Sequence, residues 1–119
     1  FRYLIKQHGG MLAKGRLLGV QFEAFLKDGL FLEIGRQEVA QAMRLQEAFL
    51  AKGWPLFVDS ASNQQFPILP NGAVAVLRHK YSFEVWEKVD QAHTAVRFCT
   101  SWSTTDEDVD ALIADIQKL

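Results

Sequence analysis

One arginine stands inside an apolar stretch that is typical of a β-strand. Residues 94–100 read TAVRFCT, with Arg97 between Val96 and Phe98. Successive side chains of a strand point to opposite faces, so Arg97 must face away from the core if Val96 and Phe98 enter it. On that face Arg97 can meet a ligand or a missing partner layer, or it can form an ordinary surface ion pair.

The other reactive side chains show no comparable pattern. The sequence predicts no metal site, because His8, His79, His93 and Cys99 are not spaced as metal ligands. It contains neither a Ser-His-Asp order nor a glycine-rich phosphate-binding loop. We interpret the histidines as surface or turn residues, and Cys99 as an inert, partly buried thiol.

The composition is that of one ordinary domain, 1–119. The 119 residues are 49% hydrophobic and 23% charged, which is enough to bury a core. Thirteen basic and fourteen acidic residues give a net charge of −1, so we expect neither nucleic acid nor a membrane as partner. A single cysteine and the lack of a long apolar run favour a cytoplasmic protein. Because the chain starts at Phe1 without a signal peptide, we expect it to begin partway through a larger gene product.

Periodicity predicts the elements that would position Arg97. We expect helices over 1–8, 11–28 and 30–52, strands over 54–60 and 63–70, a short helix capped by Asn71, strands over 83–89 and 94–100, and a final helix. Thr104 and Glu107 have the spacing of a capping box for this last helix. The inward faces predicted for the second, third and last helices are, in order, Met11, Gly15, Leu18, Gly19, Phe22 and Leu26; Val39, Ala42, Met43, Gln46, Phe49 and Leu50; and Val109, Leu112, Ile113 and Ile116.

This order of elements predicts an α+β fold with a mostly antiparallel sheet of three to four strands and helices packed on one face. The final helix would cover the face that holds Val96 and Phe98. The opposite face would stay uncovered, with Arg97 beside the small residues Cys99 and Ser101. We therefore expect a missing partner layer or a ligand to meet Arg97 there.

Three separated blocks of the sequence suggest a family. They are IKQHGGMLAKGRLLGVQF at 5–22, SNQQF at 62–66 and VRFCTSWSTTDEDVDAL at 96–112. In this order they resemble the C-terminal part of the threonine aldolases and related β-eliminating lyases. The resemblance implies the small C-terminal domain of an aspartate-aminotransferase-like fold, the fold type I class of pyridoxal-phosphate enzymes. It covers essentially the whole chain.

The resemblance also implies roles for two residues. Arg97 matches the family's arginine that binds the α-carboxylate of the amino-acid substrate. Lys6 matches a lysine near the active site, although a solvated lysine at a helix end explains it as well. The family's Schiff-base lysine lies upstream, so no catalytic residue is expected in 1–119. Ser62-Asn63 replaces the more usual threonine-asparagine pair.

The function implied for the full-length protein is that of a pyridoxal-phosphate-dependent lyase of amino-acid metabolism. The most specific expectation is a threonine aldolase that cleaves threonine or allo-threonine to glycine and acetaldehyde. Its partners would be the amino-acid substrate, its own N-terminal large domain and further copies in a homodimer or homotetramer. Residues 1–119 alone would neither bind the cofactor covalently nor be an enzyme. The alternatives are another β-eliminating lyase, an aminotransferase of the same fold, or an independent protein-interaction domain.

Overall fold

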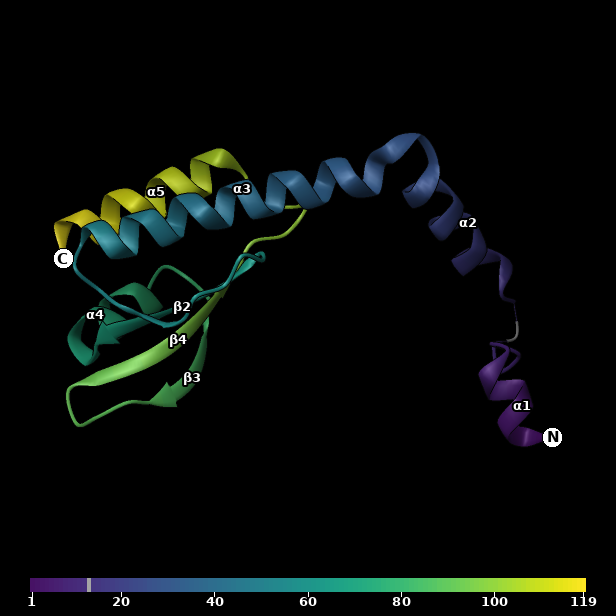
Figure 1. Ribbon diagram of the computed structural model, residues 1–119, viewed down its shortest axis with the longest axis horizontal. Helices are drawn as coiled ribbons and strands as arrows, with labels where there is room; N and C mark the ends of the chain where they lie inside the picture. The colour runs from purple at the N-terminus through teal and green to yellow at the C-terminus, as the bar shows by residue number, and fades with distance from the viewer. Residues whose placement is uncertain (13) are drawn as a thin grey trace. The chain divides into compact units, whose positions relative to one another are not determined.

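Figure 1 shows the computed structural model, which describes residues 1–12 and 14–119. The chain divides into two compact units, 1–34 and 35–119, and each is described by itself. None of the helices in the described ranges is both long enough and apolar enough to cross a membrane. The single domain expected over 1–119 stays a prediction.

The first unit consists of helices. It contains α1 (Arg2–Gln7), α2 (Arg16–Leu26) and the 3-10 turn η1 (Lys27–Gly29), after which α3 (Leu30–Ala51) begins. The prediction that the second helix starts at Met11 is wrong, because the chain turns at Gly9, with φ of 70°, and becomes regular only at Arg16. Ala13 of that predicted helix lies outside the described residues.

The apolar face predicted for α2 is exposed in the described part of this unit. Leu18 is 43% exposed, and Phe22 and Leu26 are each 64% exposed. The spacing of apolar residues therefore identified a stripe on the helix, but the described residues of 1–34 supply no core to cover it. The periodicity of a sequence predicts which side of a helix is apolar, but it does not predict what packs on that side.

The second unit contains a four-stranded antiparallel sheet, which confirms the α+β prediction. Its strands are β1 (Leu56–Val58), β2 (Gln64–Pro70), β3 (Glu84–Lys88) and β4 (His93–Cys99). They lie in the order β1-β2-β4-β3, so β4 is an inner strand and β3 is an edge strand. Gln65 of β2 pairs with Phe98 of β4, and Glu84 of β3 pairs with Arg97.

Helices cover one face of this sheet. Figure 1 shows α3 side by side with α5 (Asp106–Lys118), and α4 (Asn71–Arg78) also contributes to the core. The Gln41 side chain donates to the carbonyl oxygen of Thr104 at 3.0 Å, and Lys52 Nζ donates to that of Gln117 at 3.2 Å. The buried cluster beneath the helices is Leu45, Phe49, Trp54, Leu69, Ala73, Leu77, Val96, Phe98, Val109, Leu112 and Ile116.

Two predicted helix caps are wrong. The capping box of α5 joins Thr105 and Asp108, one residue beyond the predicted Thr104 and Glu107. Both pairs have the same spacing, and Thr104 instead accepts a hydrogen bond from the Ser101 amide. Asn71 does not cap α4, because its side-chain Nδ2 donates to Gln91 O at 2.9 Å and its side-chain oxygen accepts from the Thr94 hydroxyl at 2.8 Å.

The predicted inward face of α3 is partly confirmed. Ala42 and Phe49 are fully buried, whereas Leu50 is 49% exposed and Leu45, which was not predicted, belongs to the core. A continuous apolar stretch such as AFLA allows more than one stripe, so the exact face depends on the sheet beneath it.

Asp115 provides a pH-dependent link between α5 and the end of α4. Its carboxylate accepts hydrogen bonds from Lys80 Nζ (2.6 Å), Tyr81 OH (2.8 Å) and Lys118 Nζ (2.9 Å). These hydrogen bonds hold the pKa of Asp115 well below its usual range; the bond from Lys80 has the largest effect, followed by those from Lys118 and Tyr81. A carboxyl with a lowered folded-state pKa stabilises the fold above its unfolded pKa of about 3.9, and this contribution is lost as the pH falls through the folded-state pKa.

We therefore expect Asp115→Asn to be less stable than the wild type at pH 7, with a difference that narrows below about pH 4. Urea midpoints of the full-length protein at pH 7 and pH 3 measure this difference. Glu47→Gln, at an exposed position of α3, is the matched control. An equal loss of stability at both pH values would contradict the electrostatic account.

Candidate functional site

Arg97 lies on the sheet face opposite to the helices. Its neighbours Val96 and Phe98 belong to the buried core, while Arg97 is half-buried, so the predicted alternation of β4 is confirmed. The carbon at the centre of its guanidinium lies 5.6 Å from the ring centroid of Trp86 on β3. Phe66 on β2 meets the same indole edge to face, at 5.1 Å between centroids. The three side chains form a group that we call the Arg97 platform.

The pairing of the strands explains why these side chains meet. In the β2–β4 register, Gln65 pairs with Phe98 and Ile68 with Ala95, which places Phe66 opposite Arg97. The β3–β4 register shifts between Val85 and Glu87, so Trp86 is an extra residue in β3. Such a bulge bends a strand and redirects the side chain at that point. The platform thus depends on three neighbouring strands, two of which are inner strands.

The guanidinium of Arg97 keeps hydrogen-bonding capacity. Its Nε is buried and has no hydrogen-bond partner among the described residues. The ion pairs found in the described ranges involve Arg44, Lys80, Lys118 and His93, and Arg97 is in none of them. Glu84, which pairs with Arg97 in the register, is exposed. The guanidinium is a permanent cation beside a flat aromatic surface, and its Nε–H is an unused donor among the described residues. Such a group suits a small anion such as a carboxylate.

The strand ends beside the platform are held by Asn63 and Thr100. The Asn63 side chain donates to Thr100 O at 2.8 Å, and the Thr100 amide donates to Asn63 O at 3.0 Å. The hydroxyl of Thr100 donates to Glu38 O of α3 at 2.7 Å. In this chain Asn63 therefore fixes the start of β2 against the end of β4, whereas the Ser62 hydroxyl accepts from the Gln64 amide at 3.2 Å. The sequence alone did not suggest Thr100 as the partner.

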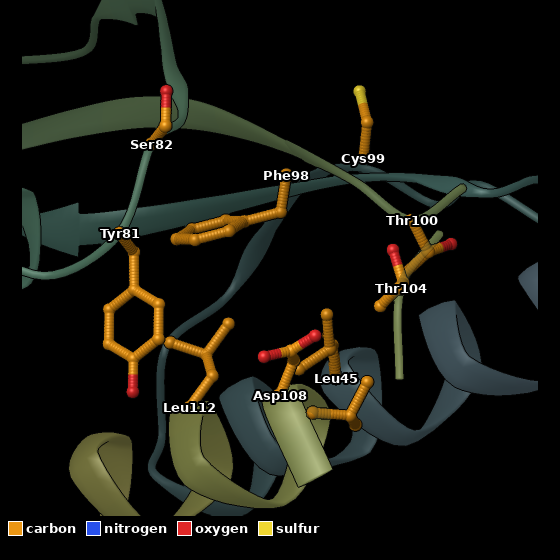
Figure 2. Close-up of a pocket in the computed structure, with 10 residues that line it drawn as sticks. Leu45, Tyr81, Ser82, Phe98, Cys99, Thr100, Thr104, Asp108 and Leu112 are labelled. Atoms are coloured by element: carbon orange, nitrogen blue, oxygen red, sulfur yellow. The ribbon is translucent and has the colours of Figure 1, made fainter. Parts of the chain in front are cut away.

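A pocket of about 140 Å³ lies on the helix-covered side of β4 and not at Arg97. Figure 2 shows Phe98 reaching into it from the sheet, with the Cys99 sulfur turned away. Cys99 is exposed, which corrects the partly buried thiol of the sequence prediction. The pocket's one carboxylate, Asp108, accepts from the Thr105 hydroxyl at 2.9 Å and the Thr105 amide at 3.2 Å, and these bonds lower its pKa. Asp108 is thus committed to capping α5, and we place the candidate site at Arg97.

The other residues considered from the sequence lie elsewhere. Lys6 is exposed in the last turn of α1, within the unit 1–34, so its role near an active site stays a prediction. His93 Nδ1 lies 3.0 Å from Asp90 Oδ2 in the turn between β3 and β4. Among residues 1–12 and 14–119, no three histidine, cysteine, aspartate or glutamate side chains gather where they could hold a metal ion.

Comparison with solved structures identifies relatives of this chain. The threonine aldolase of Leishmania major is 38% identical, with a TM-score of 0.91 over 98% of this chain and 34% of that one. The serine palmitoyltransferase of Sphingomonas wittichii (18% identity, TM-score 0.55, 71% of this chain and 24% of that one) shares the fold. The 8-amino-7-oxononanoate synthase of Francisella tularensis also shares the fold, with 15% identity and a TM-score of 0.58 over 86% of this chain and 30% of that one.

This chain spans about a third of the length of the aldolase that it matches. No protein-family model matches it, and no curated protein sequence matches it significantly. Its similarity to the aldolase extends over both helical and sheet regions, including the blocks that suggested the family in the first place. The chain belongs to the family of threonine aldolases and related β-eliminating lyases, with the aspartate-aminotransferase-like fold.

Proposed function

We propose that this chain is the C-terminal part of a pyridoxal-phosphate-dependent lyase that cleaves threonine or allo-threonine to glycine and acetaldehyde. In this proposal Arg97 binds the α-carboxylate of the substrate. The observation that supports it best is the position of Arg97 on the uncovered sheet face, with a buried Nε that has no partner among the described residues. The similarity to the Leishmania aldolase supports the choice of substrate.

Three of the seven lysines of this chain contact groups of the C-terminal helix α5 or its end. Lys80 and Lys118 contact Asp115, and Lys52 donates to a carbonyl at the end of α5. By resemblance to the family, we propose that the cofactor-binding lysine lies in an upstream large domain. When bound, pyridoxal phosphate supplies an electron sink for the bond that breaks at the substrate Cα.

Arg97 would fix which Cα bond is cleaved. A guanidinium holds both carboxylate oxygens in its own plane, so it sets the rotation of the Cα substituents as well as the position of the substrate. It also stays charged across the working pH range. The chain would thus contribute orientation and charge, and the upstream domain would contribute the reacting group.

The remaining surface fits a part of a larger assembly. Exposed apolar residues of the first unit include Leu17, Phe22 and Phe31, at 74%, 64% and 49% exposure. We propose that the enzyme's own large domain and a second copy in a homodimer or homotetramer cover such surface in the full-length protein. We place this enzyme in the cytoplasm.

The test is product analysis with the full-length protein. Incubated with threonine or allo-threonine, it is expected to release glycine and acetaldehyde in equal amounts, while residues 1–119 alone release neither. Ammonia with a keto acid from either substrate would indicate a different β-eliminating lyase, and amino transfer to a keto acid would indicate an aminotransferase. Both results would contradict the aldolase assignment.

A further inference from the structure

Trp86 is the least expected member of the Arg97 platform. It is a large apolar side chain that remains 51% exposed on an edge strand. Its indole is nevertheless placed by two independent features: the register shift of β3 brings it toward β4, and the Phe66 ring meets it edge to face at 5.1 Å. Both features place the ring beside Arg97.

The contact between Trp86 and Arg97 restricts the arginine. A distance of 5.6 Å from the guanidinium carbon to the ring centroid lies within the range of cation-π attraction. An arginine side chain has much rotational freedom when it is unrestrained, and fixing it on binding opposes the association. The attraction to Trp86 reduces this freedom before a ligand arrives.

Stacking and ligand binding can use the same guanidinium. Its hydrogen bonds lie in its own plane, whereas its contact with an aromatic ring uses the flat face. Arg97 can therefore touch Trp86 and still present N–H groups to a carboxylate. The buried Nε, which has no acceptor within the described residues, shows that the protein itself does not consume all of these donors.

We propose that Trp86 is a positioning residue that orients Arg97 for the substrate carboxylate, an inference that rests on the proposed function. It acts through Arg97 and does not touch the reacting atoms. Its contribution is to binding, so it lowers KM more than it changes kcat. The requirement is for an aromatic ring at position 86 and not merely for apolar volume.

The experiment compares Trp86→Ala, Trp86→Phe and Trp86→Leu in the full-length, cofactor-loaded enzyme. Loss of the ring in Trp86→Ala is expected to raise KM for threonine roughly three- to thirtyfold. The kcat is expected to change by less than about twofold. Phenylalanine should restore most of the wild-type KM, whereas leucine should not. The dissociation constant of glycine, measured by calorimetry, should rise in parallel with KM.

Two further variants separate positioning from general effects. Adding Trp86→Ala to Arg97→Ala should change neither KM nor kcat further, because the tryptophan acts only through the arginine. Trp102→Ala, at a turn residue that is 75% exposed, is the matched control and should leave KM unchanged. Thermal unfolding of each variant shows whether the fold is intact. If Trp86→Ala does not fold, the KM values of Trp86→Phe and Trp86→Leu show whether an aromatic ring is required.

The possible outcomes distinguish a failure of the role proposed for Trp86 from a failure of the role proposed for Arg97. If Arg97→Ala leaves KM and kcat unchanged, the proposed role of the arginine fails first. If Arg97→Ala impairs the enzyme but Trp86→Ala does not raise KM, only the role of Trp86 is overturned. Equal KM values for the leucine and phenylalanine variants, or additive effects in the double variant, overturn it as well.

Discussion

If the full-length protein is the threonine aldolase proposed above, replacement of Arg97 by alanine is expected to lower its kcat/KM for threonine by about two to four orders of magnitude. Each charge-assisted hydrogen bond contributes roughly 1.5–3 kcal/mol, and a guanidinium can make two of them to one carboxylate. Every 1.36 kcal/mol corresponds to about tenfold in rate. Steady-state kinetics with threonine measure the loss. The absorbance of the bound cofactor should hardly change, because Arg97 contacts the substrate in this account.

Arg97→Lys and Glu84→Gln complete this experiment. Lysine keeps the charge but loses the two-point geometry, so it should recover only part of the activity. Glu84 on β3 pairs with Arg97 in the strand register, so its neutral variant tests whether the arginine acts as half of a surface ion pair. Near wild-type turnover in both Arg97 variants, or a loss in Glu84→Gln as large as that in Arg97→Ala, would make Arg97 a structural residue.

The second large effect concerns the core beneath the sheet. Phe49 of α3 is fully buried, and its ring centroid lies 6.2 Å from that of Trp54 and 5.3 Å from that of Phe98. Truncation of such a side chain leaves a cavity, so Phe49→Ala should lower the free energy of unfolding by about 3–5 kcal/mol. Urea denaturation of the full-length protein, followed by tryptophan fluorescence, measures this change.

The adjacent residue supplies the control. Leu50 is 49% exposed, although its apolar neighbours suggested an inward position. Leu50→Ala should therefore change the free energy of unfolding by less than about 1 kcal/mol. Similar losses for both variants would mean that α3 is rotated relative to the packing described above.

Much of the second unit could be predicted from local patterns. Alternation in TAVRFCT placed Val96 and Phe98 in the core and Arg97 on the other face, because the period of a strand leaves only two choices. The stripe of Val109, Leu112 and Ile116 likewise identified the buried face of α5. Both elements place one face on the same core, so sequence period and burial agree.

Other features depend on contacts that local patterns do not record. Thr104 and Thr105 both precede an acidic residue at the spacing of a capping box, and only the turn formed with Ser101 decides between them. The Arg97 platform depends on the pairing of three strands and on a register shift at Trp86. The one available signal was an exposed tryptophan in a charged edge strand, EVWEK, which periodicity treats as ordinary surface.

The buried Nε of Arg97 has a consequence for protein engineering. A buried donor that lacks an acceptor in the described residues destabilises the fold by about 1–3 kcal/mol relative to a satisfied one. An apolar residue of similar length, such as methionine, would remove this penalty and pack against Trp86 and Phe66. Directed evolution for heat resistance alone would therefore favour loss of the arginine, and a library built from the full-length protein should be selected for the proposed activity at the same time.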